Sequence, residues 1–133
     1  MKVFIVEDAS QTRKDIAEAL AAVKEFEIVG QAESVRDAKR GIHATSPETV
    51  ILDISLPDGS GVEILKMVRN QRMGICVVVL TFDPSCELQK KCMELGAAAV
   101  FDKLNGFKKA FEFLRLRLPA ADVRIGEAGL SCG

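Results

Sequence analysis

The stretch Glu48–Gly61 constrains the fold more than any other part of the chain, because an apolar run within it ends abruptly in a carboxylate. The run Val50–Leu52 leads directly into Asp53, and a loop rich in Pro, Asp and Gly follows before a helical pattern begins at Val62. Short apolar runs bounded by turn residues are typical of strands buried on both faces. Open α/β sheets bind ligands at the carboxyl ends of such strands. Asp53 must therefore be paired, bound to metal or chemically used.

The rest of the chain alternates in the same way between short apolar runs and helical patterns. Strands are predicted at Lys2–Val6, Glu27–Ala32, Val50–Leu52, Ile75–Leu80 and Ala97–Phe101. Helices are predicted after Ser10, after the capping-box pattern Ser34-x-x-Asp37, from Val62, after Asp83-Pro84 and from about Asn105. Ser10 and Asp83 are expected to cap their helices, and Gly96 to close the fourth helix. This alternation specifies a parallel sheet with helices on both faces.

The length of 133 residues corresponds to a single domain with a proper core. The domain is expected to cover residues 1–118. Residues 119–133 contain three glycines and no sustained period, which predicts a flexible tail or the start of a linker. There is no second run of elements that would predict an output domain.

Composition narrows the class of protein. A formal net charge of −1 argues against a nucleic-acid binder that relies on phosphate contacts. No apolar run is long enough to predict a membrane span, and Met1–Val6 is too short for a signal peptide. The four cysteines form no Cys-x-x-Cys pair, which favours free thiols in a reducing compartment. We therefore expect a cytoplasmic protein.

Four of the five predicted strands end in polar residues suited to chemistry. These are Glu7-Asp8, Asp53, Thr81 and Lys103. The carboxyl ends of parallel strands lie at one edge of the sheet, so these side chains are expected to converge. Three carboxylates so close would raise one another's pKa unless a cation lay between them, and Mg²⁺ suits oxygen ligands of this kind. Acids, a metal, an ammonium and a hydroxyl together indicate a phosphoryl-transfer site, with a carboxylate as the nucleophile.

These residues occur in a recognisable order. The motifs are Val6-Glu7-Asp8, Leu52-Asp53 followed by Leu56–Gly61, Leu80-Thr81, and Gly96-Ala97 leading to Asp102-Lys103. Over about residues 1–118 the chain resembles the receiver domain of bacterial two-component response regulators, either standing alone or excised from a longer chain. The resemblance implies a flavodoxin-like α/β fold with a five-stranded parallel sheet in the order 2-1-3-4-5.

The resemblance also implies a role for each acid. Asp53 would accept a phosphoryl group from a sensor histidine kinase or a phosphotransfer protein. Asp8 and Asp53 would bind Mg²⁺, for which Mn²⁺ could substitute, and Glu7 would assist through a water molecule. The backbone carbonyl of Ser55 would complete the protein ligands.

The remaining site residues would carry the switch. Lys103 would pair with one phosphoryl oxygen, and Thr81 would move to hydrogen-bond another. In the family this movement alters the face formed by the fourth helix, the fifth strand and the fifth helix, where a downstream protein or a second copy of the chain would bind. The chain would catalyse its own phosphorylation and dephosphorylation without being an enzyme of sustained turnover. Direct binding of nucleic acid or of a membrane is not expected.

Three positions depart from the family pattern. Val100 stands where an aromatic switch residue is usual, and strand alternation should point the adjacent Phe101 to the other face. Leu104 follows the lysine where the family often has a cis proline, so a trans bond is expected. Phe82 stands where a small residue is common, and we expect it to narrow access to the phosphoryl group and slow its hydrolysis.

Other functions stay open at this point. The chain could be the receiver half of a DNA-binding transcriptional regulator. An aspartate-nucleophile phosphatase would need an acid two residues after Asp53, where this chain has Ser55. A flavodoxin-like cofactor binder would need a phosphate-cradling loop after the first strand, where Glu7-Asp8 would repel phosphate.

Overall fold

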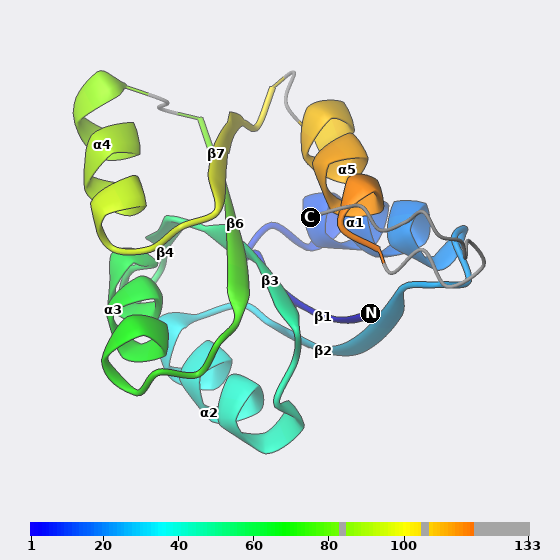
Figure 1. Ribbon diagram of the computed structural model, residues 1–133, viewed down its shortest axis with the longest axis horizontal. Coiled ribbons are helices and arrows are strands. Elements are labelled where there is room, and N and C mark those ends of the chain that lie inside the picture. The colour runs from blue at the N-terminus through cyan, green and yellow to red at the C-terminus, as the bar shows by residue number, and fades with distance from the viewer. Residues whose placement is uncertain (83–84, 105–106, 119–133) are drawn as a thin grey trace, which may run out of the picture.

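A five-stranded parallel sheet forms the centre of the computed structural model, which describes residues 1–82, 85–104 and 107–118 (Figure 1). Its strands are β1 (Lys2–Val6), β2 (Glu27–Ala32), β3 (Thr49–Asp53), β6 (Cys76–Thr81) and β7 (Ala99–Asp102). The strand order is β2-β1-β3-β6-β7 and every pair is parallel. Counted along the main sheet this is the predicted order 2-1-3-4-5, and the weakly apolar β2 lies at an edge as expected.

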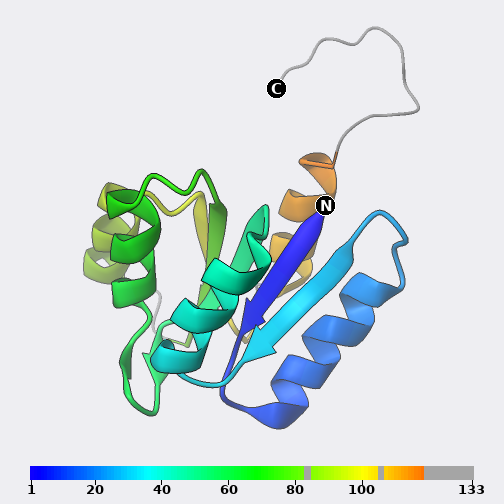
Figure 2. The ribbon, with the colours of Figure 1, turned by 90° about the horizontal axis from the view of Figure 1, so that it is seen from below.

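Helices cover both faces of the sheet (Figures 1 and 2). They are α1 (Ser10–Ala21), α2 (Val35–Thr45), α3 (Val62–Asn70), α4 (Cys86–Glu94) and α5 (Phe107–Leu116). Successive strand residues point to opposite faces, so each face has its own apolar core. Residues of α2, α3 and α4 share one core with Phe4 and Val6, whereas residues of α1 and α5 share the other with Val3 and Ile5. The predicted α/β class is confirmed.

Two of the expected helix caps are wrong. The residue before α1 is Ala9, which makes no side-chain capping bond, and Ser10 is already helical. The cap of α4 is Ser85, whose hydroxyl accepts the Leu88 N–H at 3.2 Å, while Asp83 and Pro84 lie outside the described residues. Ser85 directly precedes Cys86, the first helical residue, and from this position a hydroxyl reaches a free N–H of the first turn. The Ser34 cap and the Gly96 terminus (φ +99°) are confirmed.

A small hairpin between β3 and α3 was not predicted. Its strands are β4 (Ser55–Leu56) and β5 (Gly59–Ser60), which pair antiparallel. Behind it, the backbone of Gly61 lies so close to β3 that an added Cβ would stand 2.5 Å from the Asp53 carbonyl oxygen. A residue with a side chain would push α3 away from the strand that ends at Asp53. Within the described residues, no helix is both long and apolar enough to cross a membrane.

Candidate functional site

The polar residues at the strand ends converge at one edge of the sheet, as predicted. Asp53 is in register with Leu80 at the end of β6, and Thr81 is in register with Asp102. Glu7, directly after β1, is 1% exposed, Asp53 is 5% exposed and Thr81 is 4% exposed. Buried charged groups require partners. Their shared location makes this edge the candidate site.

Lys103 provides the charge that these buried acids need. Its Nζ lies 2.8 Å from Glu7 Oε1 and 3.1 Å from Asp53 Oδ2, and its side chain is 7% exposed. The Lys103 backbone N–H donates to the Thr81 carbonyl at 2.8 Å, which fixes the lysine relative to the end of β6. One ammonium therefore bridges two carboxylates that come from different strands.

Asp53 and Glu7 share a single ammonium group, so Asp53 lies among more negative than positive charge. The pKa of Asp53 is raised to about 6, because burial and then the Glu7 charge raise it more than Lys103 lowers it. Burial also lowers the pKa of Lys103, but its hydrogen bonds to Glu7 and Asp53 outweigh this, so the pKa lies above its ordinary value. One ammonium does not fully compensate two carboxylates, which leaves room for a further cation.

A metal ion would fit this arrangement. Carboxylate oxygens of Glu7, Asp8 and Asp53 lie within 4.8 Å of one another. Asp8 is exposed, so it offers a carboxylate to an ion that keeps part of its water shell, as Mg²⁺ does. The donor set of hard oxygens therefore suits Mg²⁺ or Mn²⁺.

Glu7 has more than the metal-assisting role that the sequence suggests. Its Oε1 pairs with Lys103, and its Oε2 accepts the Ala9 N–H at 3.1 Å. The Glu7 backbone carbonyl accepts Nη1 of Arg13 at 2.8 Å. Both carboxylate oxygens of Glu7 are thus engaged with the protein, so of the two adjacent acids the exposed Asp8 is the better placed to touch an ion. Two adjacent acids in a sequence do not reveal which one the fold buries.

The Ser55 backbone stands beside Asp53, where the sequence places a metal-binding carbonyl. The Ser55 N–H donates to Asp53 Oδ1 at 3.2 Å. This bond orients the Asp53 carboxylate, with its other oxygen directed to Lys103. The position of Ser55 next to the acid cluster is compatible with the predicted ligand role of its carbonyl.

The aromatic residues near the site lie on different faces. Val100 packs against the core of α2, α3 and α4, whereas Phe101 packs in the opposite core with its ring centroid 5.9 Å from that of Phe113. Strand alternation therefore directs Phe101 away from Thr81's side, as expected. Phe82 is 64% exposed, and its ring centroid lies 4.8 Å from Lys103 Nζ. The sequence predicted Phe82 at the site but not this contact with the lysine.

Asp58 has a role that turn chemistry alone did not predict. Its Oδ1 accepts the Val35 N–H at 2.7 Å and its Oδ2 accepts the Arg36 N–H at 3.1 Å. These hydrogen bonds at the start of α2 hold the pKa of Asp58 below its ordinary value. Asp58 therefore ties the loop that follows Asp53 to the N-terminus of α2. No local pattern reveals a cap supplied from 23 residues away.

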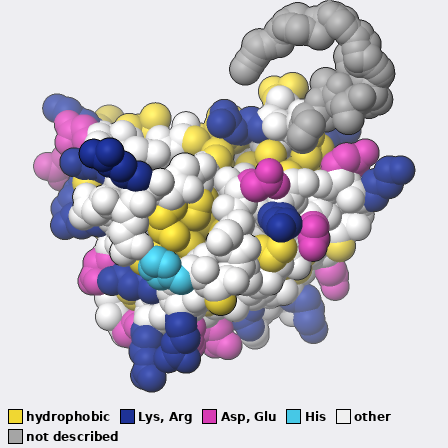
Figure 3. All heavy atoms as spheres, turned by 60° about the horizontal axis from the view of Figure 1, so that its bottom comes forward, with side chains coloured by type: hydrophobic (Ala, Val, Ile, Leu, Met, Phe, Trp, Pro, Cys, Tyr) yellow, Lys and Arg dark blue, Asp and Glu magenta, His cyan; other side chains and the backbone are white. Residues whose placement is uncertain are grey.

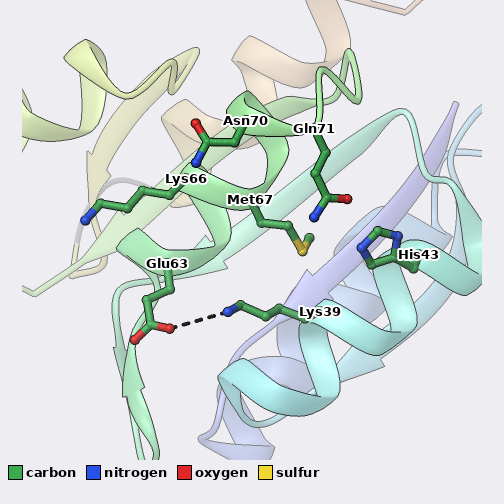
Figure 4. A pocket seen from close by; sticks show the side chains of 7 residues that line it. All are labelled: Lys39, His43, Glu63, Lys66, Met67, Asn70 and Gln71. Atoms are coloured by element: carbon green, nitrogen blue, oxygen red, sulfur yellow. Dashed lines mark hydrogen bonds and ion pairs between the residues drawn. The ribbon is translucent and has the colours of Figure 1, made fainter.

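A hollow in the surface lies away from the strand ends, between α2 and α3 (Figure 4). In the close-up the Lys39 and Glu63 side chains point toward each other across it, with 3.4 Å between Nζ and Oε1. Figure 3 shows a hydrophobic area directly beside the histidine side chain, with lysine, arginine and acidic side chains farther out. This surface contains none of the acids of the candidate site, so we do not assign the phosphoryl-transfer chemistry to it.

Comparisons with known proteins agree with the fold and identify the family. The family model for the response regulator receiver domain matches residues 3–115. The DNA-binding transcriptional activator DevR/DosR of Mycobacterium tuberculosis is 32% identical over 111 residues, which cover 83% of this chain and 51% of that protein. The chain thus spans about half the length of this curated relative.

Solved structures are similar in fold. A DNA-binding response regulator of the LuxR family from Staphylococcus aureus superposes with a TM-score of 0.81 at 24% identity, covering 89% of this chain and 98% of that chain. The response regulator domain of CheB from Thermotoga maritima superposes with a TM-score of 0.78 at 20% identity, covering 94% of this chain and 98% of that chain.

Proposed function

The chain belongs to the response regulator receiver domain family, and from this premise we propose that Asp53 accepts its phosphoryl group. The donor would be a sensor histidine kinase or a phosphotransfer protein. The observation that carries the proposal is a carboxylate that is 5% exposed at a strand end, bonded to a buried ammonium and lying within 4.8 Å of two further acids. A buried acid in such surroundings has a raised pKa and a nucleophilic oxygen close to a compensating cation.

The chemistry follows from the placement of the side chains. A carboxylate oxygen of Asp53 forms a bond to phosphorus while the bond from phosphorus to the donor breaks and the donor leaves with the electron pair. Lys103, already 3.1 Å from Asp53, stabilises negative charge on the transferred group. Asp8, Asp53 and the Ser55 carbonyl would hold Mg²⁺ or Mn²⁺, with Glu7 reaching it through water. The ion supplies positive charge that offsets the negative charge of the phosphoryl oxygens and the acids.

The output would follow from a change of charge at Asp53. Phosphorylation adds about −1.5 to −2 charge units and three acceptor oxygens. Thr81 would turn toward one of these oxygens and Lys103 toward another, which biases the loop after β6 between two states. The Lys103 N–H bond to the Thr81 carbonyl supports a coupled movement of these two strand ends.

We propose that a downstream protein binds the face formed by α4, β7 and α5. A hollow of about 540 Å³ on the β7 and α5 part of this face is lined mainly by apolar side chain surface. Its lining residues are Phe101, Lys108, Lys109, Glu112, Phe113 and Leu116. Leu116 is 86% exposed, whereas Phe113 packs on Phe101, so the outer edge of the hollow keeps an apolar side chain available. A second copy of this chain is the alternative occupant.

A larger protein is the second candidate context. The activator that this chain resembles is described as DNA-binding, and the chain covers 51% of it. We propose that, within such a protein, residues 1–118 act as the receiver and residues 119–133 begin a linker.

The proposed kinase partner and the free thiols of Cys76, Cys86 and Cys92 support a cytoplasmic location. Because Ser55 occupies the position where a phosphatase would need an acid, we propose no sustained hydrolytic turnover.

The test of the proposed function is covalent modification of Asp53. The purified chain is incubated with acetyl phosphate and Mg²⁺, and its intact mass is measured. We expect one added phosphoryl group in the wild type and none in Asp53→Asn, because an amide is not a nucleophile for this step. Asp58→Asn is the matched control and should still be modified. Added mass in both the wild type and Asp53→Asn, or in neither, would contradict the proposal.

The access role of Phe82 is tested by the lifetime of the modified protein. Phe82→Ala removes an exposed ring beside Lys103, which opens a path for water to the phosphoryl group. We expect the lifetime of phosphorylated Asp53 to fall several-fold. Intact mass followed over time after removal of the phosphodonor measures it. A lifetime that is unchanged or longer would contradict an access role.

A further inference from the structure

The ring of Phe82 lies over the ammonium of Lys103, with 4.8 Å between Nζ and the ring centroid. Phe82 is 64% exposed, and single exposed apolar side chains are common, so its exposure alone has no meaning. The contact is different, because this ammonium is the one that bridges Glu7 and Asp53. The Lys103 side chain is only 7% exposed. Phe82 is therefore part of what separates the Lys103 ammonium from water.

The position of the ring complements the other contacts of the ammonium. An ammonium has three donors and no acceptor. Glu7 Oε1 at 2.8 Å and Asp53 Oδ2 at 3.1 Å receive two of them. The negative face of an aromatic ring attracts a cation within about 6 Å. The ring thus supplies a third favourable direction without offering a competing negative charge that would hold Lys103 away from a phosphoryl oxygen.

The backbone keeps the two side chains in this relation. Lys103 is tied to the end of β6 by its N–H bond to the Thr81 carbonyl at 2.8 Å, and Phe82 is the next residue after Thr81. Val100, by contrast, has no ring and packs into the apolar core. In the described part of the chain, Phe82 is the aromatic residue that contacts a charged group of the site.

We propose that Phe82 is a positioning residue for phosphoryl transfer, which holds the Lys103 ammonium against Asp53 through its ring face. This inference rests on the proposed function of Asp53. With the ring in place, Lys103 has fewer orientations and stays beside Asp53, where the transferred group arrives, so less ordering is required in the transition state. Because Phe82 adjoins Thr81, a movement of Thr81 toward the phosphoryl group also changes the position of the ring over Lys103.

A series of substitutions separates the ring's π face from its bulk. Phe82→Leu keeps an apolar side chain of similar size but removes the π face, whereas Phe82→Tyr and Phe82→Trp keep it. The rate of Asp53 phosphorylation by acetyl phosphate with Mg²⁺ is followed by intact mass, with acetate leaving as the new bond to phosphorus forms. We expect Phe82→Leu to be about fivefold slower than wild type, while Phe82→Tyr and Phe82→Trp stay within about twofold. Equal rates for Phe82→Leu and Phe82→Tyr would overturn the proposal.

A second measurement needs no phosphorylation. The methylene protons next to Lys103 Nζ lie near the ring face, so their NMR signals in the full chain should be shifted upfield in the wild type and in Phe82→Tyr. The shift should vanish in Phe82→Leu while the thermal unfolding midpoint changes little. Absence of phosphorylation in the wild type would contradict the proposed function of Asp53. Absence of the upfield shift in a wild type that is phosphorylated would contradict only the positioning role of Phe82.

Movement of the side chain at position 82 can be followed by tryptophan fluorescence. The chain contains no Trp, so Phe82→Trp introduces a single indole at this position. Its fluorescence should change on phosphorylation in the presence of Mg²⁺, because the charge beside the ring changes, and the same variant carrying Asp53→Asn should show no change. Fluorescence that stays constant while the intact mass shows complete phosphorylation would contradict the coupling of Phe82 to Thr81 and Lys103.

Discussion

At the scale of single residues, the site holds two buried carboxylates and one buried ammonium, so its charges do not balance. Glu7 and Asp53 are nearly inaccessible to water and share the ammonium of Lys103. The desolvation of two carboxylates is only partly offset by one cation, and the raised pKa of Asp53 reflects this. The charged form of Asp53 is therefore unfavourable, and a bound metal ion or a proton would stabilise the site. A change in the charge on Asp53 consequently changes the energy of the site.

This uneven charge predicts a pH dependence of stability. The pKa of Asp53 is about 6 in the folded chain and 3.8 ordinarily, so the folded state binds the proton more tightly than the unfolded state. The free energy of unfolding should therefore decrease as pH rises from about 4 to about 6 and remain lower above that. In metal-free buffer at pH 7.5, Asp53→Asn should be more stable than wild type by about 1–3 kcal/mol. Urea unfolding at several pH values measures both effects.

The matched control for this prediction is Asp58→Asn. The pKa of Asp58 is lowered by the N–H groups of Val35 and Arg36, so its contribution to stability is present above its ordinary pKa and is lost as pH falls. Asp58→Asn should therefore lower stability at pH 7.5, with a sign opposite to that of Asp53→Asn. Equal signs for the two variants would contradict the electrostatic account of the site.

At the scale of elements, close approaches of glycine define how the sheet and its helices meet. The ring of Phe4 on β1 packs against Gly30 of β2 and Gly41 of α2, where an added Cβ would lie 2.5 Å from a ring carbon at either position. Phe4 is 2% exposed, so the ring cannot move into solvent. These two glycines allow α2 to sit closely on the strand pair whose β1 end carries Glu7 and Asp8.

Substitution of Gly41 tests this packing. Gly41→Ala places a methyl group against the Phe4 ring, and overpacking of this kind costs about 1–3 kcal/mol. The better helix propensity of Ala offsets up to about 1 kcal/mol of this. We expect a net loss of about 1–2 kcal/mol in the free energy of unfolding, measured by urea denaturation. In a Phe4→Leu background the same substitution should cost less, and purely additive effects would argue against contact between the two residues.

At the scale of the whole molecule, the topology is responsible for the site. Crossover connections that each contain a helix make all five strands parallel, so residues at positions 7, 53, 81 and 103 meet at one edge although they are far apart in the chain. The opposite faces of the sheet are closed by helices, which leaves the strand ends as the natural opening for chemistry (Figure 2). A ligand bound there stabilises the folded chain as a whole.

Addition of Mg²⁺ should therefore raise the stability of the wild type by mass action. At a free Mg²⁺ concentration ten times the dissociation constant, the gain is about 1.4 kcal/mol. Thermal unfolding with increasing MgCl₂ measures it, with equal ionic strength of NaCl as the control for screening. The gain should be much smaller in Asp8→Asn, because Asp8 is the exposed acid of the cluster. An equal response of wild type and Asp8→Asn would exclude Asp8 as a ligand.

The amino-acid sequence by itself determined the α/β class, the five main strands and the edge at which the polar residues meet. These features depend on short-range patterns, namely apolar runs, helical spacing and turn residues, and on the rule that parallel strands end at one edge. The cap of α4 was wrong by two residues, because Asp83 and Ser85 are both good capping residues and local sequence does not choose between them.

The tertiary structure alone decided how the site residues are paired. It buried Glu7 rather than Asp8, joined Glu7 and Asp53 through Lys103, placed the Phe82 ring over that lysine, and used Asp58 to cap α2. Each of these contacts joins residues that are 20 or more positions apart, and burial sets the strength of the ionic contacts. Local sequence contains no information on which side chains lose their water, and that loss governs the electrostatics of this site.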